Sequence, residues 1–165
     1  MNRMIIVCGR TGAGKTTYSV SLSREINAVR FSIDPWMQTL FADDMKSLDY
    51  SWMIDRVYRC YEQIWDTCEK IFSTGGSVVL DLGFTEKKQR KLFADRANAL
   101  NIVPEVHFID APKDIRKARI DKRNAEKNPE VYAFDVTDTM FSFMEPRFEE
   151  PDDIELKNGL IVNTG

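Results

Sequence analysis

Short apolar runs alternate with stretches of helical periodicity along the whole chain. The apolar runs have the length and composition of buried strands and occupy residues 4–8, 29–33, 77–82, 103–109 and 160–163. Between them, helical spacing, caps and prolines predict helices at residues 17–26, 35–41, 51–73, 85–100, 112–124 and 137–145. Alternating strands and helices are typical of an α/β domain. The 165 residues are enough for one such domain with a sizeable core.

The longest predicted helix, at residues 51–73, carries one broad apolar stripe. Aromatic side chains are frequent between Trp36 and Trp65, and we expect most of them in the core. Trp36 and Trp52 lie off the main stripe or at the start of an element. We therefore expect these two side chains to line a substrate pocket.

A glycine-rich loop joins the first predicted strand to the first predicted helix. Residues 9–16 read GRTGAGKT and fit the phosphate-binding pattern G-x-x-x-x-G-K-[ST], also called Walker A. The defining positions are Gly9, Gly14, Lys15 and Thr16. A plain turn between a strand and a helix needs no Lys-Thr pair at this position. The loop therefore indicates a site for a nucleoside triphosphate.

Each part of such a loop has a chemical role. Glycines let the backbone turn its N–H groups toward an anion, and the following helix adds the positive end of its dipole. We expect Lys15 to reach the outer phosphates and the hydroxyl of Thr16 to ligate Mg²⁺. The predicted ATP-binding residues are Gly9, Arg10, Thr11, Gly12, Ala13, Gly14, Lys15, Thr16 and Thr17.

Two of the predicted strands end at an aspartate. Asp34 follows the strand at 29–33, and Asp81 lies near the end of the strand at 77–82. Parallel strands place ligands at their carboxyl ends. Asp34 has two interpretations that can coexist: the N-cap of the next helix, or a carboxylate that faces the terminal phosphate. Asp81 fits a Walker B-like carboxylate that orients magnesium or substrate, with a simple strand-end turn as the alternative.

Three arginines share one face of the predicted helix at 112–124. Arg116, Arg119 and Arg123 recur at spacings of three and four residues. In a phosphoryl-transfer enzyme they would clamp phosphate oxygens, whereas in most proteins such a charged face is simply solvated. The loop-like composition of residues 125–135 predicts a lid, which together with the arginines covers about 116–136.

Composition narrows the class of protein. With 43% hydrophobic and 30% charged residues, the chain is typical of a soluble globular protein. A net charge of −3 gives no strong basic field for a long nucleic acid. Three cysteines without metal-ligand spacing favour a reducing, cytoplasmic setting, and we expect the single histidine, His107, to be structural. No apolar stretch has the length of a membrane span.

Several stretches of the chain resemble the small P-loop kinases related to the kinase domain of phage polynucleotide kinase. Zeta toxin, chloramphenicol phosphotransferase and gluconate kinase are more distant relatives, and many bacterial members are described only as AAA-family ATP-binding proteins. The similar stretches are GRTGAGKTT at 9–17, FSID at 31–34, VVLDLGFTEKKQRKLFADRA at 78–97, FIDAPKDIRKARIDKRN at 108–124 and VTDTMFSFMEPRFEEP at 136–151.

This resemblance implies a three-layer P-loop fold with a five-stranded parallel sheet in the order 2-3-1-4-5. It also implies that Asp34 activates the acceptor hydroxyl, that Asp81 serves the acceptor or metal site, and that Arg119 and Arg123 are lid arginines. The chain departs from the group in two places: Pro35-Trp36-Met37 follows the first aspartate, and Leu82 replaces a small polar residue. Both departures make the acceptor side more apolar.

The features together predict ATP-dependent phosphorylation of a hydroxyl on a small molecule. Lys15, the loop and magnesium would hold ATP, Asp34 would accept the proton, and Arg119 and Arg123 would stabilise the transferring charge. Trp36 and Asp81 would help to bind the acceptor. A polynucleotide or nucleotide-sugar kinase is the alternative among enzymes, with the polynucleotide disfavoured by charge. A non-kinase ATP-binding switch or ATPase is the alternative from another class.

Overall fold

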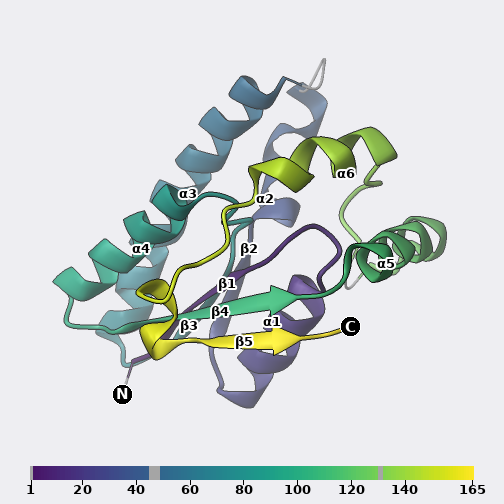
Figure 1. The fold of residues 1–165 in the computed structure, drawn as a ribbon. Coiled ribbons are helices and arrows are strands. Elements are labelled where there is room, and N and C mark those ends of the chain that lie inside the picture. Colours follow the sequence, from purple (N-terminus) through teal and green to yellow (C-terminus); the bar gives the residue numbers. More distant parts are fainter. Residues whose placement is uncertain (1, 45–48, 130–131) are drawn as a thin grey trace.

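The chain folds around a single parallel sheet, seen in a computed structural model that describes residues 2–44, 49–129 and 132–165. The five strands follow the order β2-β3-β1-β4-β5 and all pair in parallel (Figure 1), which confirms the predicted topology. They are β1 (Met4–Cys8), β2 (Val29–Ser32), β3 (Val78–Asp81), β4 (Pro104–Asp110) and β5 (Leu160–Asn163).

Six α-helices connect and cover these strands within the described ranges. They are α1 (Lys15–Glu25), α2 (Ile33–Phe41), α3 (Tyr50–Ser73), α4 (Lys87–Ala99), α5 (Lys113–Glu126) and α6 (Asp138–Met144). Three short 3₁₀ helices, which the periodicity did not predict, are η1 (Ala42–Asp44), η2 (Glu145–Arg147) and η3 (Glu155–Asn158).

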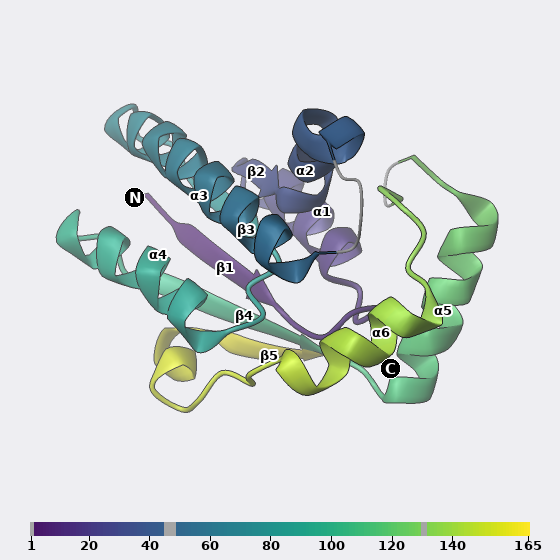
Figure 2. The same cartoon turned by 90° about the horizontal axis from the view of Figure 1, so that it is seen from above.

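The sheet is the middle of three layers, because alternate residues of its strands face opposite sides. Met4, Ile6 and Cys8 pack in the cluster formed with α3 and α4, whereas Ile5 and Val7 pack with apolar side chains of α1. Figures 1 and 2 show α3 and α4 on one side of the sheet and α1 on the other. The central strand β1 is fully buried, as its apolar run predicted.

Local signals placed most elements correctly and missed some of their ends. Helix α2 begins at Ile33, so Asp34 lies in its first turn, while Ser32 occupies the cap position. The interpretation of Asp34 as an N-cap is therefore wrong. Helix α4 starts with a capping box between Glu86 and Gln89, one residue after the expected Thr85. Residues 45–48, between the helices predicted at 35–41 and 51–73, and residues 130–131 of the predicted lid lie outside the described residues.

Helix α5 packs directly on the glycine loop. Gly12 has φ +81°, a left-handed conformation that side chains rarely adopt, and a Cβ there would lie 2.5 Å from the carbonyl oxygen of Arg116. The loop backbone thus lies against the first turn of α5. In the described part of the chain, no helix is both long enough and apolar enough to cross a membrane.

We expect Gly12→Ala to be considerably more destabilising than Gly75→Ala, which is its matched control. Gly75 has nearly the same φ, +84°, but a Cβ there meets nothing within 4 Å. Gly75→Ala should lower the free energy of unfolding by about 1 kcal/mol through backbone strain alone. Gly12→Ala should cost about 1–3 kcal/mol more through the clash with Arg116. Urea denaturation measures both; equal losses would mean that α5 does not constrain the loop.

Candidate active site

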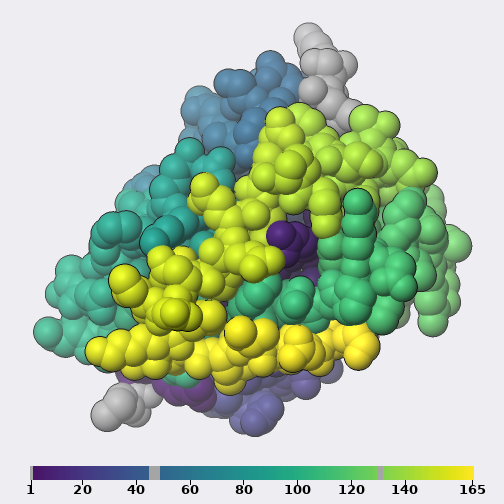
Figure 3. Space-filling view, viewed as in Figure 1, coloured from purple at the N-terminus to yellow at the C-terminus, as the bar shows by residue number. Residues whose placement is uncertain are grey.

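A cavity of about 1030 Å³ opens at the carboxyl end of the sheet. Its walls come from the glycine loop, from α2 and α3, from the segment after β3, and from α5 with the chain that follows it. Figure 3 shows an opening between the green and yellow-green segments, with purple atoms of the N-terminal segment inside it. Ligand pockets usually span roughly 300–1,000 Å³, so this cavity can accept two small ligands side by side.

Lys15 is held inside the glycine loop. Its ammonium Nζ donates to the carbonyl oxygens of Gly9, at 2.8 Å, and Arg10, at 3.0 Å. Burial lowers the pKa of Lys15, against the opposing charges of Asp81 and Asp34. Lys15 also lines the cavity, as do Thr16 and Thr17. A cation in this environment is partly desolvated, so a hydrogen bond to an incoming phosphate oxygen stabilises it strongly.

Side chains from α5 and from the end of β5 bind the outer carbonyl oxygens of the loop. Arg116 donates to the oxygen of Thr11, at 3.2 Å. Arg119 Nη1 and the Thr164 hydroxyl both donate to the oxygen of Ala13, at 3.3 and 2.7 Å. Arg119 additionally donates to both oxygens of Thr164. These bonds fix the loop from outside without using its backbone N–H groups, one of which, that of Ala13, donates to the oxygen of Arg10.

The three arginines of α5 therefore have different positions. Arg116 is almost fully buried and donates at 2.9 Å to Glu145, so it ties the loop to η2. Arg119 lines the cavity but is anchored to the loop and to Thr164. Arg123 also lines the cavity, and its buried Nε finds no hydrogen-bond partner within the described ranges. Of the three, Arg123 is the one whose guanidinium makes no hydrogen bond or ion pair in the described ranges.

Asp34 points a carboxylate into the same cavity from the first turn of α2. It makes no ion pair or hydrogen bond among the residues that the structure describes. Its side chain is exposed where it lines the cavity. The protein that surrounds this position still makes desolvation the main reason why the pKa of Asp34 is raised; the charge of Asp81 adds to it, and Lys15 and Arg123 oppose it.

Asp81, at the end of β3, is the opposite case. It is buried, and its Oδ2 accepts from Arg30 at 2.7 Å and from Ser19 at 3.1 Å. Arg30 Nε also donates to the hydroxyl of Ser19, at 2.6 Å. No sequence motif predicts this network. Its one signal in the sequence is Arg30, a charged residue within strand β2. The network fixes the Asp81 carboxylate at the cavity wall.

The residues present fit a magnesium ion that keeps most of its water. Thr16 and Asp81 both line the cavity, as predicted for a metal site. No group of three or more His, Cys, Asp or Glu side chains that could cage a metal occurs in the described ranges. Mg²⁺ usually binds through one or two protein ligands together with phosphate oxygens and water. Such an ion would therefore arrive with the nucleotide.

The two tryptophans that were predicted to line a substrate pocket, Trp36 and Trp52, have different locations in the structure. Trp52 lines the cavity from α3. Trp36 is not among the described residues that line it; its ring packs against Phe31, with centroids 6.4 Å apart, on the main core. Trp36 therefore does not lie where we predicted, in the substrate pocket. The sequence shows that Trp36 is not part of the apolar stripe of α3, but it does not show in which direction α2 orients the side chain.

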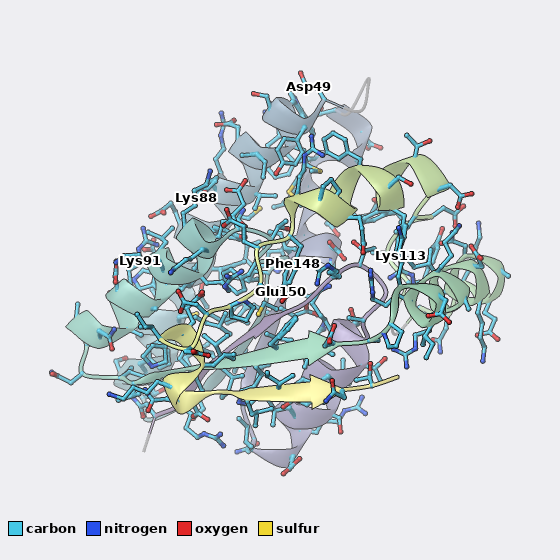
Figure 4. The ribbon with its side chains drawn as sticks, viewed as in Figure 1. Asp49, Lys88, Lys91, Lys113, Phe148 and Glu150 are labelled. Carbon is cyan, nitrogen blue, oxygen red and sulfur yellow. The ribbon has the colours of Figure 1, made fainter. Side chains whose placement is uncertain are left out.

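The chain beyond α5 is bound in two places, once to α5 and once to the glycine loop. Asn124 donates to the oxygen of Val136 and accepts from its N–H, at 2.9 and 3.1 Å, so the end of the predicted lid is tied to α5. Further on, Arg10 pairs with Glu150 at 2.6 Å and lies 5.2 Å from the ring centroid of Phe148. Figure 4 labels Phe148 and Glu150 on the segment between α6 and β5.

Solved structures share this fold at low sequence identity. Kti12 from Chaetomium thermophilum, solved with ADP-AlF3, is 16% identical with a TM-score of 0.71, covering 97% of this chain and 87% of its own. The APS kinase of Mycobacterium tuberculosis, solved with AMPPNP and APS, is 13% identical with a TM-score of 0.62, covering 97% and 88%. A gluconokinase from Sinorhizobium meliloti is 12% identical with a TM-score of 0.61, covering 98% and 82%.

These likenesses establish the fold, and two of the three proteins were solved with bound nucleotides. No curated protein matches the chain. A family comparison, in contrast, matches residues 4–151, from the first residue of β1 to beyond η2. The matched range includes the glycine loop, both aspartates and all three arginines of α5. The chain belongs to the AAA domain family AAA_33.

Proposed function

We propose that this protein transfers the terminal phosphoryl group of ATP to a hydroxyl of a small molecule. One observation carries the proposal: an unpaired carboxylate, Asp34, shares a cavity with the phosphate-binding loop. A protein that only bound ATP would not need an unpaired carboxylate at the cavity wall beside the loop. A kinase needs one to orient the acceptor hydroxyl and take its proton.

The donor half of the site is the loop with Lys15 and Thr16. On ATP binding, the ammonium of Lys15 exchanges its bonds to the carbonyls of Gly9 and Arg10 for phosphate oxygens. Bound Mg²⁺, held by Thr16 and oriented from the side of Asp81, would neutralise charge on the outer phosphates. The guanidinium of Arg123, which lines the cavity and makes no ion pair in the described ranges, stabilises the charge that spreads over the transferring group.

The acceptor half is centred on Asp34. Its carboxylate accepts a hydrogen bond from the substrate hydroxyl, whose oxygen attacks the terminal phosphorus in line with the bond that breaks. The bond from that phosphorus to the bridging oxygen is cleaved, ADP leaves, and the hydroxyl proton passes to Asp34. A raised pKa makes Asp34 a better proton acceptor than an ordinary aspartate.

Asp34→Asn should abolish transfer without abolishing ATP binding. The amide keeps the size of the side chain but cannot take the proton, so transfer should fall by about 10²–10⁴-fold. Nucleotide affinity, measured by titration calorimetry, should stay close to wild type because the loop is unchanged. Asp43→Asn, an exposed change outside the cavity, is the control. Transfer by Asp34→Asn at the wild-type rate would refute the role of Asp34.

The pH dependence of transfer should report the same group. Because the pKa of Asp34 is raised above its ordinary value of 3.8, the rate should fall on acidification at a higher pH than a solvent-exposed aspartate would give. Protonated Asp34 cannot accept the hydroxyl proton, so the acid limb is the inactive one. A pH–rate profile of the wild-type enzyme measures this limb, and a profile that stays flat down to pH values near 4 would contradict the assignment.

Thermal unfolding gives a second readout of the Asp34 pKa that needs no substrate. The fold binds the Asp34 proton more tightly than the unfolded chain does, so this stabilisation exists at low pH and is lost as the pH rises through the raised pKa. Asp34→Asn should therefore have a higher Tm than wild type at neutral pH. The difference should shrink as the pH falls toward 3.8; a lower Tm for the variant at neutral pH would argue against a desolvated Asp34.

A further inference from the structure

Positive charge is distributed unevenly around the cavity. Every lysine and arginine that lines it within the described ranges comes from the glycine loop or from α5: Arg10, Lys15, Arg119, Lys122 and Arg123. The opposite wall, built by α2, α3 and the segment from β3 to α4, contributes none there. It contributes two carboxylates, Asp34 and Asp81. We call this the acceptor wall, because Asp34 belongs to it.

The acceptor wall is otherwise apolar and rich in flat or flexible side chains. They include Met37, Phe41, Trp52, Met53, Val57 and Leu82. A guanidinium does lie near this wall: that of Arg56, 3.9 Å from the ring centroid of Trp52. Arg56 donates to the carbonyl oxygen of Trp52 and pairs with Asp55, and it does not line the cavity.

Three polar side chains of the acceptor wall are already paired within the protein. The hydroxyl of Tyr61 donates to the oxygen of Leu82 at 2.8 Å, and that of Thr85 donates to the oxygen of Gly83 at 2.7 Å. Asp81 is paired with Arg30. These groups shape the wall but have little capacity left to select a ligand.

Besides Asp34, three polar side chains of this wall keep an unpaired group within the described residues: Gln38, Tyr50 and Gln89. Of these, Gln89 is the buried one. It lines the cavity and is only 2% exposed, at the first turn of α4. Its Oε1 accepts from the backbone N–H of Glu86 at 3.0 Å, which completes the capping box and fixes the orientation of the amide. Its Nε2 donates to no group in the described part of the chain, yet it is not sealed from the cavity. A buried, oriented donor without a partner is unfavourable unless a ligand accepts from it.

We propose that the acceptor is an uncharged alcohol with a flat apolar body and a second oxygen that accepts a hydrogen bond from Gln89. The inference rests on the proposed kinase function and names its substrate class. An acceptor that carried a phosphate, sulfate or carboxylate would face the unpaired carboxylate of Asp34 on a wall from which no lysine or arginine lines the cavity in the described ranges. A polyol would leave many hydroxyls against apolar side chains.

Matched benzyl alcohols test the substrate class with the wild-type enzyme, ATP and Mg²⁺. para-Acetylbenzyl alcohol offers an apolar ring and a neutral carbonyl oxygen, para-isopropylbenzyl alcohol lacks that oxygen, and para-carboxybenzyl alcohol replaces it with an anion. Phosphate transfer should give kcat/KM values about tenfold or more higher for the acetyl compound than for either other compound. Gluconate, uridine and an oligonucleotide with a free hydroxyl end complete the panel.

The outcomes separate this inference from the function on which it rests. Better transfer to gluconate, uridine, the oligonucleotide or the anionic alcohol overturns the substrate class and leaves the kinase standing. If no hydroxyl compound, in this panel or a broad metabolite panel, accelerates ATP consumption above the water background, the kinase function itself fails.

Gln89→Glu tests the role of the amide. Glutamate keeps an oxygen for the N–H of Glu86 but replaces the Nε2 donor with an anionic oxygen. The preference for the acetyl over the isopropyl alcohol should disappear, while the KM for ATP stays close to wild type. The Tm should fall, because the new carboxylate is buried. Glu86→Ala is the matched control: it removes the other bond of the capping box, so the Tm should fall while the preference remains. A preference that survives in Gln89→Glu overturns the role of Gln89.

Discussion

The arrangement of the molecule depends on the backbone hydrogen bonds of one loop. A loop that turns its N–H groups toward an anion must find other donors for its carbonyl oxygens, because each buried carbonyl left unpaired costs about 1–3 kcal/mol. Here Lys15 binds two of them, Arg116 binds that of Thr11, and Arg119 with Thr164 binds that of Ala13. The position of α5 and the end of β5 thus follow from the needs of the loop.

This constraint explains why the sequence predicted the shared face of the α5 arginines but not the separate role of each arginine. Their spacing places them on one face, and the loop motif places that face near phosphate. Spacing does not reveal that the same face must also supply donors to the loop carbonyls, so Arg116 and Arg119 bind backbone oxygens while Arg123 keeps a free Nε. The strands and helices were predictable because their signals are local. The turn of Trp36 onto the core depends on tertiary packing, which no local pattern contains.

The two aspartates show how one cavity produces two kinds of carboxylate. Asp81 comes from a buried strand, where an unpaired charge would be very costly, and Arg30 and Ser19 of neighbouring elements compensate it. Asp34 comes from the first turn of a helix at the cavity wall and has no such partner in the described residues. The loss of hydration raises the pKa of Asp34 and lowers that of Lys15. Each charged group therefore gains from a ligand group that replaces its water: a hydroxyl at Asp34 and a phosphate oxygen at Lys15.

The uneven distribution of charge around the cavity also follows from the structure of the phosphate loop. The cations on one side of the cavity belong to the phosphate loop and to α5, which supports it. The residues on that side can therefore change little without loss of phosphate binding. The acceptor wall comes from α2, α3 and α4, whose side chains serve no loop carbonyl among the bonds described above. Trp36 acts on this wall from behind: packed on Phe31, it supports the helix that carries Asp34 and Met37. A change at Trp36 should therefore alter acceptor binding through the position of α2, while the loop that holds ATP, supported from the other side, stays in place.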